Sequence, residues 1–267
     1  MPSEHTPLAS DTRTMTPDSK RMIGLVDLTR LESNDPNDAQ EAEAIRVLCD
    51  RAGTDCGPVA AVCVHATWVR LADHRLRESG LRDAIRLATV ANFPAGTGSI
   101  DEVRAEIEGA ISDGADEIDV VLPWRSLRDG NLNSAQQLLA ASRMACSNHC
   151  MKVILETGEL DDRELIEQAA RIALACGADF LKTSTGKVPI NATLAAAAVV
   201  LEVIRESERD IGFKVSGGIR TTNEAAGYLR LAEQMMGADW IDARHLRFGA
   251  SSLLDDLLAQ ARATAQQ

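Results

Sequence analysis

The sequence of 267 residues has no apolar run near the roughly 18 residues that a membrane-spanning helix requires. Its opening stretch, MPSEHTPLASDTRTMTPDSK, lacks the apolar centre of a secretory signal. Positive charge is also in deficit, because 28 Lys and Arg residues face 40 Asp and Glu residues. The net charge of −12 opposes general binding to nucleic acid or to an anionic membrane. We therefore expect a cytoplasmic protein with neither kind of partner.

Paired CxxC motifs are absent as well, although the chain contains six cysteines. In a chain of this size, unpaired spacing favours reduced thiols over a disulfide framework. Cys146, His149 and Cys150 are the one cluster that resembles a set of metal ligands. No second cluster completes four ligands, and this group falls near an expected helix end, so we expect no metal site here.

The tripeptide Gly-Ala-Asp recurs three times and organises the chain. It begins at Gly114, Gly177 and Gly237, and an apolar segment follows each copy. Stretches with helical spacing of apolar residues precede the first two copies. Each glycine is therefore expected just after a helix end, where a residue often takes a left-handed conformation.

Eight apolar segments alternate with helical patterns, and two capping boxes, Ser99 with Glu102 and Thr221 with Glu224, mark helix starts. The expected strands are IGLVDLT at 23, VAAVCVHA at 59, IRLATVANF at 85, GADEIDVVLP at 114, MKVILETG at 151, GADFLKTSTG at 177, IGFKVSGG at 211 and GADWIDARH at 237. This alternation predicts an α/β fold, a single-domain (β/α)8 TIM barrel over residues 21–260. Residues 1–20 are expected to form a polar, disordered tail and residues 261–267 a short C-terminal tail. An open doubly wound sheet is the alternative, weakened because no GxGxxG turn follows the first strand.

Charged residues interrupt five of the expected strands: Asp27, Asp119, Lys152, Lys182 and Lys214. Any one of them alone is more typical of a structural ion pair, but five in one core layer accumulate desolvation costs. Two acids against three lysines leave one positive charge in excess. A lysine near other cations and partly desolvated has a lowered pKa, so its neutral amine can attack a carbonyl to form a Schiff base.

Two segments near the end of the chain are candidates for an anion site. SGGIRTTNE begins at Ser216 and places paired glycines after the seventh strand. RFGASSLLDDLL places Gly249, Ser251 and Ser252 at the start of the last helix. The loops after strands 7 and 8 of a barrel often hold phosphate, at a helix N-terminus. The alternative for each segment alone is a tight turn and an ordinary helix cap.

Five motifs together resemble the deoxyribose-phosphate aldolase family: GADEIDVVLPWRSL, KVILETGEL, GADFLKTSTGKV, GFKVSGGIRT and GADWIDARHLRFGASSLL. The likeness runs from about Ile23 to Leu258. It implies a class I aldolase on a (β/α)8 barrel, a lyase that reversibly cleaves 2-deoxy-D-ribose 5-phosphate to D-glyceraldehyde 3-phosphate and acetaldehyde. It also implies no metal or organic cofactor, a homodimer and a role in deoxynucleoside catabolism.

The resemblance assigns roles by position. Lys182 matches the Schiff-base lysine, Lys214 the second lysine, and Asp119 the acid that moves protons. The positions that match the phosphate pocket are Gly186, Gly217, Gly218, Ser251 and Ser252, with Lys187 and Arg220 as further contributors. The positions that match the supporting network and the lining of the site are Asp27, Thr29, Cys63, Lys152 and Thr185.

One departure and two alternatives remain. Some family members have a tyrosine in a C-terminal tail that reaches the site, whereas this chain ends ARATAQQ and its one tyrosine, Tyr228, falls in an expected helix. One alternative is a metal-dependent aldolase or a sugar-phosphate isomerase on the same barrel; the metal-dependent aldolase would require converging histidines, and His65 and His245 are the plausible pair. A non-catalytic phosphosugar-binding protein would not require an activated lysine.

Overall fold

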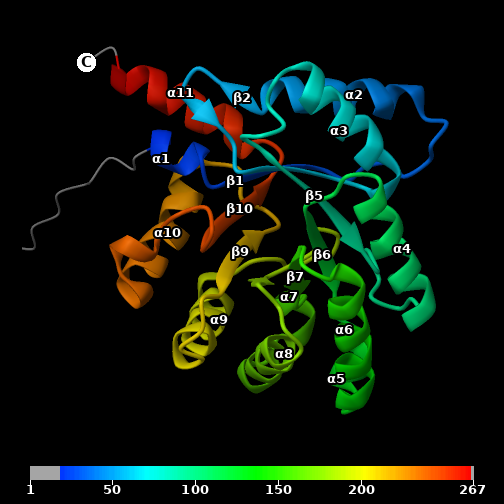
Figure 1. Cartoon of the computed structure of the whole chain (residues 1–267). Coiled ribbons are helices and arrows are strands. Elements are labelled where there is room, and N and C mark those ends of the chain that lie inside the picture. Colours follow the sequence, from blue (N-terminus) through cyan, green and yellow to red (C-terminus); the bar gives the residue numbers. More distant parts are fainter. Residues whose placement is uncertain (1–18, 266–267) are drawn as a thin grey trace, which may run out of the picture.

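Eight parallel strands close into a barrel in the computed structural model, which describes residues 19–265 (Figure 1). Around the barrel the order is β1, β10, β9, β8, β7, β6, β5 and β4, and β4 pairs with β1 again. The barrel strands are β1 Val26–Arg30, β4 Ala61–Val64, β5 Arg86–Ala91, β6 Glu117–Val121, β7 Cys150–Ile154, β8 Phe180–Lys182, β9 Gly212–Ser216 and β10 Leu246–Ala250. The closed barrel confirms the (β/α)8 prediction and rules out the open sheet.

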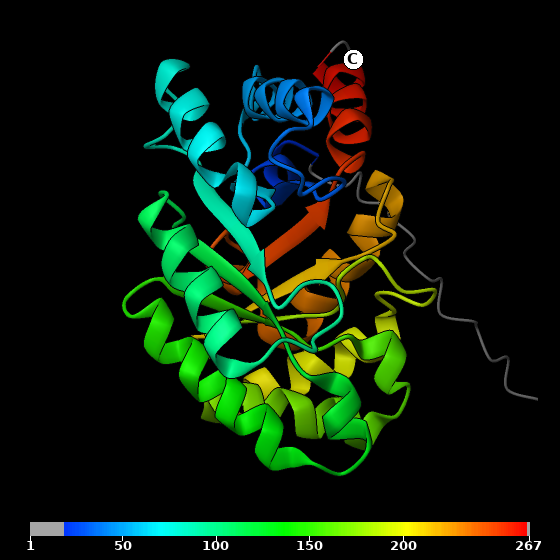
Figure 2. The ribbon, with the colours of Figure 1, turned by 90° about the vertical axis from the view of Figure 1, so that its right-hand side faces the viewer.

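A helix follows each barrel strand and packs on its outer side (Figure 2). These helices are α2 Ala39–Arg51, α3 Val69–Glu78, α4 Ile100–Ser112, α6 Leu132–Cys146, α8 Arg163–Ala175, α9 Leu194–Glu206, α10 Thr222–Met236 and α11 Leu253–Ala265. Shorter elements are α1 Ser19–Ile23, α5 Trp124–Arg128, α7 Thr157–Leu160, the 3-10 turns η1 Ala66–Trp68 and η2 Ala238–Trp240, and the hairpin of β2 Gly53–Thr54 and β3 Gly57–Pro58.

Local sequence signals set the helix ends. Both capping boxes are present, at Ser99 before α4 and at Thr221 before α10. The three repeat glycines follow α4, α8 and α10 with φ of 111° at Gly114, 86° at Gly177 and 94° at Gly237. An L side chain is strained in this left-handed region, so the repeated glycine is explained by chain reversal after a helix.

The eighth strand lies further along the chain than the sequence pattern predicts. The segment after Gly237 forms η2 instead of a strand. Asp242 then makes a turn, because its side chain accepts a hydrogen bond from the Arg244 backbone N–H at 2.7 Å and its carbonyl accepts one from that of Leu246 at 2.8 Å. This turn delays the strand until β10. As a result Gly249, expected at the last helix, lies inside that strand.

The chain ends also differ from the predicted boundaries. Of the tail expected over residues 1–20, residues 1–18 lie outside the described residues, and Ser19 and Lys20 belong to α1. The expected C-terminal tail is wrong for residues 261–265, because they continue α11. Within residues 19–265, no helix is long and apolar enough to cross a membrane.

The barrel interior has an apolar side and a charged side. Alternate residues of each strand face outward, where large side chains such as Phe213 and Phe248 join the core under the helices. On β4 and β5 the inward residues form a separate apolar cluster that includes Cys63 and Val90. On the remaining strands the interior is charged, and Lys152 and Lys214 are among the largest fully buried side chains. The buried charges of the barrel interior therefore lie on the six barrel strands other than β4 and β5.

Candidate active site

Three lysines converge on one carboxylate inside the barrel. Asp119 Oδ1 accepts a hydrogen bond from Lys152 Nζ at 2.8 Å, and Asp119 Oδ2 accepts one from Lys182 Nζ and one from Lys214 Nζ, each at 2.8 Å. Asp119 comes from β6, and the lysines come from β7, β8 and β9. The strand register thus brings together residues up to 95 positions apart. The predicted cluster of charges is confirmed by this geometry.

Asp27, on β1, completes the predicted cluster. Its Oδ2 lies 2.5 Å from Lys214 Nζ and 4.0 Å from Lys152 Nζ. Burial alone would raise the pKa values of Asp27 and Asp119, but the surrounding cations hold both below the ordinary value. Burial alone would likewise lower the pKa values of Lys152 and Lys214, but the acids raise both. These four side chains are therefore charged at neutral pH.

Lys182 behaves differently from the other two lysines. It is 2% exposed, and burial lowers its pKa below the ordinary value. Attraction to Asp119 opposes this shift, whereas repulsion by Lys214 adds to it. Among residues 19–265, Lys182 contacts one acid within 4.0 Å, whereas Lys152 and Lys214 each contact at least two. Of the three lysines, Lys182 is thus the one that most readily loses its proton to give a neutral amine.

Two further charges belong to this network and were missed in the sequence. Glu117, two residues before Asp119 on β6, places its Oε2 2.6 Å from Lys152 Nζ. Arg247, on β10, places Nη1 2.6 Å from Asp27 Oδ1 and Nη2 3.2 Å from Glu117 Oε1. Both side chains are about 5% exposed. The same criterion, a charge inside a strand, applies to Glu117 at the start of β6, and it would have identified Arg247 if the last strand had been placed correctly.

A cavity of about 310 Å³ opens at the C-terminal ends of the strands, beside Lys182. Most of the predicted phosphate residues line it: Gly186, Lys187, Gly217, Gly218, Arg220 and Ser251. Thr29 and Thr185 also belong to its lining, as predicted, together with Gly249 and Ser216. Ser252, the residue immediately before α11, does not line it. The exposed carboxylate of Glu32 is an unpredicted part of the lining.

The far end of this cavity is built to hold an anion. Gly186, Gly217 and Gly218 have φ of 81°, 91° and 84°, so backbone replaces side chains around the space. A Cβ added to Gly217 would lie only 2.5 Å from Asn191 Cβ. Ser251 leads into α11, a helix of 13 residues whose N-terminus favours negative charge.

Two cations at this cavity have no carboxylate partner. Within residues 19–265, no Asp or Glu oxygen lies within 4.0 Å of the side-chain nitrogens of Lys187 or Arg220. The Lys187 backbone N–H donates to Thr185 Oγ1 at 3.1 Å, which shapes the turn without using the ammonium group. The positive charge of both side chains therefore remains available to a bound anion.

Glu156 is a buried acid that the sequence analysis overlooked. It follows β7 with φ of 58°, accepts a hydrogen bond from the Thr185 backbone N–H at 3.1 Å and accepts another from Thr185 Oγ1 at 2.6 Å. Burial raises its pKa, and the bonds from Thr185 partly oppose that shift. Glu156 thus fixes the loop that carries Gly186 and Lys187.

The remaining predicted residues have supporting positions. Thr29 Oγ1 donates to the Asp27 carbonyl at 2.8 Å, which orients the end of β1. Cys63 is fully buried on β4, and burial raises the pKa of its thiol. Tyr228 lies in α10, as expected.

The candidate metal ligands do not assemble. Among the described residues, no group of three or more His, Cys, Asp and Glu side chains could hold a metal ion. His149 Nδ1 instead lies 3.1 Å from the Cys146 carbonyl. His65 follows β4 at the C-terminal end of the barrel, whereas His245 precedes β10 at the opposite end. The two histidines are therefore too far apart to share one ion.

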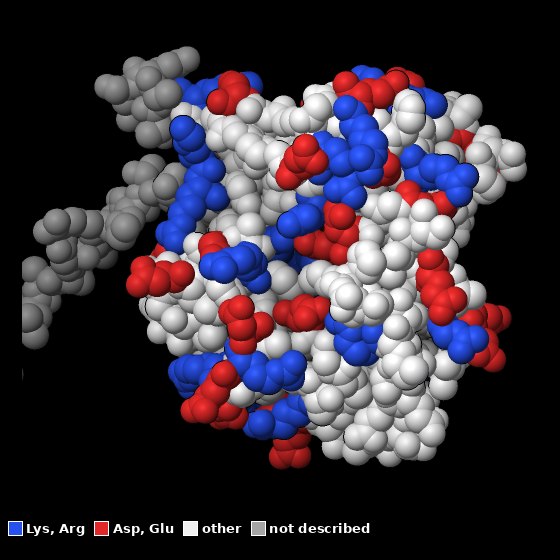
Figure 3. Space-filling view, in the orientation of Figure 1, with Lys and Arg blue, Asp and Glu red and all other residues white. Residues whose placement is uncertain are grey.

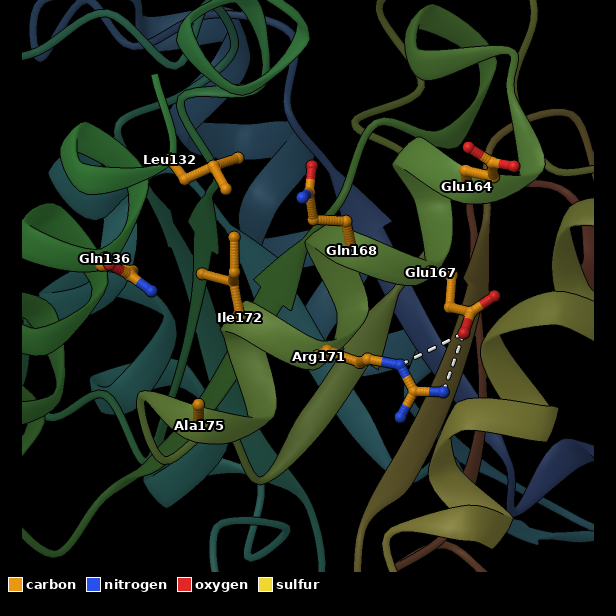
Figure 4. A pocket seen from close by; sticks show the side chains of 8 residues that line it. All are labelled: Leu132, Gln136, Glu164, Glu167, Gln168, Arg171, Ile172 and Ala175. Carbon is orange, nitrogen blue, oxygen red and sulfur yellow. Dashed lines mark hydrogen bonds and ion pairs between the residues drawn. The ribbon is translucent and has the colours of Figure 1, made fainter. Parts of the chain in front are cut away.

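A second cavity, of about 480 Å³, lies outside the barrel between α6 and α8 (Figure 4). Two of its charged lining residues pair with each other, because Arg171 Nη2 donates to Glu167 at 2.8 Å; it also donates to Glu206, outside the lining, at 2.8 Å. Elsewhere on the surface, basic and acidic side chains are interspersed over the face shown in Figure 3. The barrel cavity, unlike this second one, is lined by a lysine of lowered pKa, Lys182.

Comparisons with known proteins identify the family of this chain. The model of the family "DeoC/LacD family aldolase" matches residues 21–259. A crystal structure of a proposed deoxyribose-phosphate aldolase from Toxoplasma gondii ME49, in its apo form, is 28% identical, has a TM-score of 0.84, and covers 92% of this chain and 96% of that chain. One from Coccidioides immitis is 27% identical, has a TM-score of 0.77, and covers 90% of this chain and 87% of that chain. The chain therefore belongs to the DeoC/LacD family of aldolases.

Proposed function

We propose that this chain is a class I aldolase that reversibly cleaves 2-deoxy-D-ribose 5-phosphate to D-glyceraldehyde 3-phosphate and acetaldehyde, in deoxynucleoside catabolism. The observation that carries the proposal is the position of Lys182. Its amine has a lowered pKa, touches Asp119 at 2.8 Å and lines a cavity whose other end suits a phosphate. A binding protein would require the cavity but no such amine.

The first step is attack of neutral Lys182 Nζ on the substrate aldehyde. A new C–N bond forms while the carbonyl π electrons move to oxygen; the oxygen takes up a proton, the nitrogen gives one up, and the neutral carbinolamine results. Loss of water, with a second proton delivered to the leaving hydroxyl, produces the iminium ion. Asp119 is the group in contact with Lys182, so we assign proton movement at this stage to its carboxylate, directly or through one water.

Cleavage follows because the iminium ion accepts electrons. The C3 hydroxyl loses its proton, the C2–C3 bond breaks, and its electron pair becomes the enamine on Lys182. D-glyceraldehyde 3-phosphate is released. Protonation of the enamine and addition of water to the iminium ion then release acetaldehyde and restore the amine. Lys214 stays charged throughout and keeps repelling a proton from Lys182.

Binding of the phosphate fixes the position of the substrate relative to Lys182. The glycine turns and the start of α11 supply backbone N–H groups, and Lys187 and Arg220 supply positive charge. Anchoring the phosphate holds the aldehyde near Lys182, which converts binding energy into orientation. An unphosphorylated aldehyde should therefore bind more weakly but react by the same chemistry.

The proposal is tested by trapping. The protein is incubated with acetaldehyde or deoxyribose 5-phosphate, reduced with borohydride, digested and analysed by mass spectrometry. We expect an adduct on Lys182, unchanged by chelator. Folded protein that gives no adduct would contradict the Schiff-base mechanism, and labelling at Lys214 would reverse the assignment.

A pair of variants separates the two lysines at the cavity. Lys182→Arg keeps the positive charge but removes the nucleophile, because a guanidinium stays protonated at neutral pH. We expect no adduct and no turnover. Lys187→Arg, on the same cavity, is the matched control and should keep the adduct on Lys182. A Lys182→Arg variant with substantial activity would remove the covalent mechanism and favour another lyase or isomerase reaction.

A further inference from the structure

The ion pairs beneath Lys182 form a closed ring of six alternating charges. In order, the ring passes through Asp119, Lys152, Glu117, Arg247, Asp27 and Lys214. Its six contacts are between 2.5 and 3.2 Å long. Three acids and three bases make the ring neutral when every member is charged. Its formation explains how six buried charges are tolerated together.

Lys182 is attached to this ring but is not a member. Its Nζ contacts Asp119 Oδ2 at 2.8 Å, the same oxygen that Lys214 contacts at 2.8 Å. Since the ring is already balanced, a protonated Lys182 adds one unpaired positive charge to a buried site. A neutral Lys182 leaves the site balanced. A neutral ring therefore has no net charge with which to offset the cost of burying a protonated Lys182.

Three other titratable groups lie near Lys182 or the ring. Burial raises the pKa of the Cys63 thiol, and it raises that of Cys150 to about 12, so neither thiol carries charge at neutral pH. Glu156 is close enough to act on Lys182, but its carboxylate is hydrogen bonded to Thr185 and belongs to no ion pair within 4.0 Å among the described residues. None of the three completes or interrupts the ring.

Glu117 and Arg247 occupy the half of the ring that is far from the substrate. Both line a cavity of about 440 Å³ together with the first residues of β5, β7 and β8, at the N-terminal ends of the strands. The substrate cavity lies at the opposite ends. Neither residue can touch a substrate bound next to Lys182. Among the described residues, the hydrogen bonds and ion pairs of both side chains go to other ring members or to backbone, and the Arg247 guanidinium also lies 5.7 Å from the centre of the Phe180 ring.

We propose that Glu117 and Arg247 are positioning residues of the lysine centre, whose opposite charges act through the ring to set the protonation of Lys182. This inference rests on the catalytic role proposed for Lys182. It leads to a test by sign, because the two residues carry opposite charges within one network. A residue that only supports packing would not shift the protonation of Lys182 in a direction given by its charge.

Three variants change the charge of the ring in known steps. Arg247→Met makes it negative, so Lys182 should hold its proton to higher pH. Glu117→Gln makes it positive, so Lys182 should lose its proton at lower pH. The double variant E117Q/R247M restores neutrality and should return Lys182 to the behaviour of the unmodified protein. Each single change should move the pH at which half of Lys182 is deprotonated by about one pH unit, which is a change of roughly tenfold in the share of neutral amine.

The readout is the reactivity of the amine itself. Intact protein is labelled briefly with acetic anhydride over a series of pH values, and mass spectrometry gives the extent of acetylation at Lys182. The midpoint of this curve reports protonation and requires no substrate. Failure of the proposed aldolase reaction would therefore appear separately, as absence of turnover of deoxyribose 5-phosphate with a normal labelling curve.

Arg244→Met is the matched control. Arg244 lines the same cavity as Arg247 but pairs with Asp242 at 2.7 Å and lies outside the ring, so its loss should leave the midpoint unchanged. Three outcomes would overturn the inference. The midpoints of the two single variants could shift in the same direction, the midpoint of the double variant could fail to return to that of the unmodified protein, or R244M could shift the midpoint equally. If R247M alone fails to fold, the midpoint of the double variant must still lie above that of E117Q, and a lower value would refute the proposal.

Discussion

The substitution Asp119→Asn separates two duties that one carboxylate can perform. Asp119 accepts hydrogen bonds from three lysines at 2.8 Å each, so it both neutralises positive charge and stands in contact with the nucleophile. Asparagine keeps the shape of the side chain and removes its charge. Loss of the charge should lower the pKa of Lys182 and so make its amine easier to label. Loss of proton transfer should instead slow turnover.

The charge effect is large. With an effective dielectric constant of about 20, Coulomb's law gives the attraction across 2.8 Å between Asp119 and Lys182 as roughly 6 kcal/mol. Its loss should lower the pKa of Lys182 further, since burial and Lys214 already act in that direction. Leaving buried cations without their partner should also reduce the free energy of unfolding by about 3–5 kcal/mol.

The proton-transfer effect has the opposite consequence for catalysis. A missing general acid or base typically costs about 10²–10⁴-fold in rate. We therefore expect D119N to show a lower labelling midpoint at Lys182 together with kcat/KM for deoxyribose 5-phosphate reduced by at least about 10². Asp116→Asn is the control, because Asp116 pairs with Arg82 at 2.9 Å outside the site. A D119N protein that is folded and retains full kcat/KM would refute the assignment of proton transfer to Asp119.

Three further outcomes are expected. Gly217→Ala should cost about 1–3 kcal/mol of stability and should raise KM more for deoxyribose 5-phosphate than for deoxyribose. Gly80→Ala, also at positive φ but in open space, is the control and should cost stability alone. Equal KM changes for the two substrates in the Gly217 variant would show that Gly217 does not belong to the phosphate site. Glu156→Gln should raise KM about tenfold with kcat nearly unchanged, because the loop carrying Thr185 loses a charged acceptor, and a selective loss of kcat would show that Glu156 acts elsewhere. In urea unfolding from pH 7 to pH 3, stability should begin to fall below about pH 4. The folded pKa values of Asp27 and Asp119 lie below the unfolded value of about 3.9, so their contribution is fully present above that value and decreases progressively as the pH falls from it toward the folded pKa values. Constant stability down to pH 3 would contradict those depressed pKa values.

The sequence was sufficient for the barrel and for the centre of the site because both produce periodic signals. A lysine inside an apolar strand, such as Lys182 or Lys214, breaks a pattern that extends over several residues. Positive φ at Gly114 and Gly177 could be anticipated because a helix must stop before the next strand starts. These signals are local, and each is visible within about one element.

The missed residues depend on contacts that no local pattern contains. Glu117 begins β6, where an acid is easily taken as an exposed strand end, and only the 2.6 Å contact with Lys152 shows that it is an internal partner. Arg247 was missed because the turn at Asp242 shifts β10 along the chain. Glu156 has a left-handed backbone after β7, and its importance follows from Thr185, 29 positions away.

The closing contact of the ring has a consequence for synthesis. Asp27 and Arg247 are 220 positions apart. The ion pair between β1, the first barrel strand to be synthesised, and β10, the last one, can therefore form only after β10 has been synthesised. A nascent chain that lacks β10 contains Asp27 and Glu117 without the guanidinium that joins them. Burial of unpaired acids is costly, and long-range closure is slow. The barrel should therefore reach its native state only after Arg247 has emerged from the exit tunnel, late in translation.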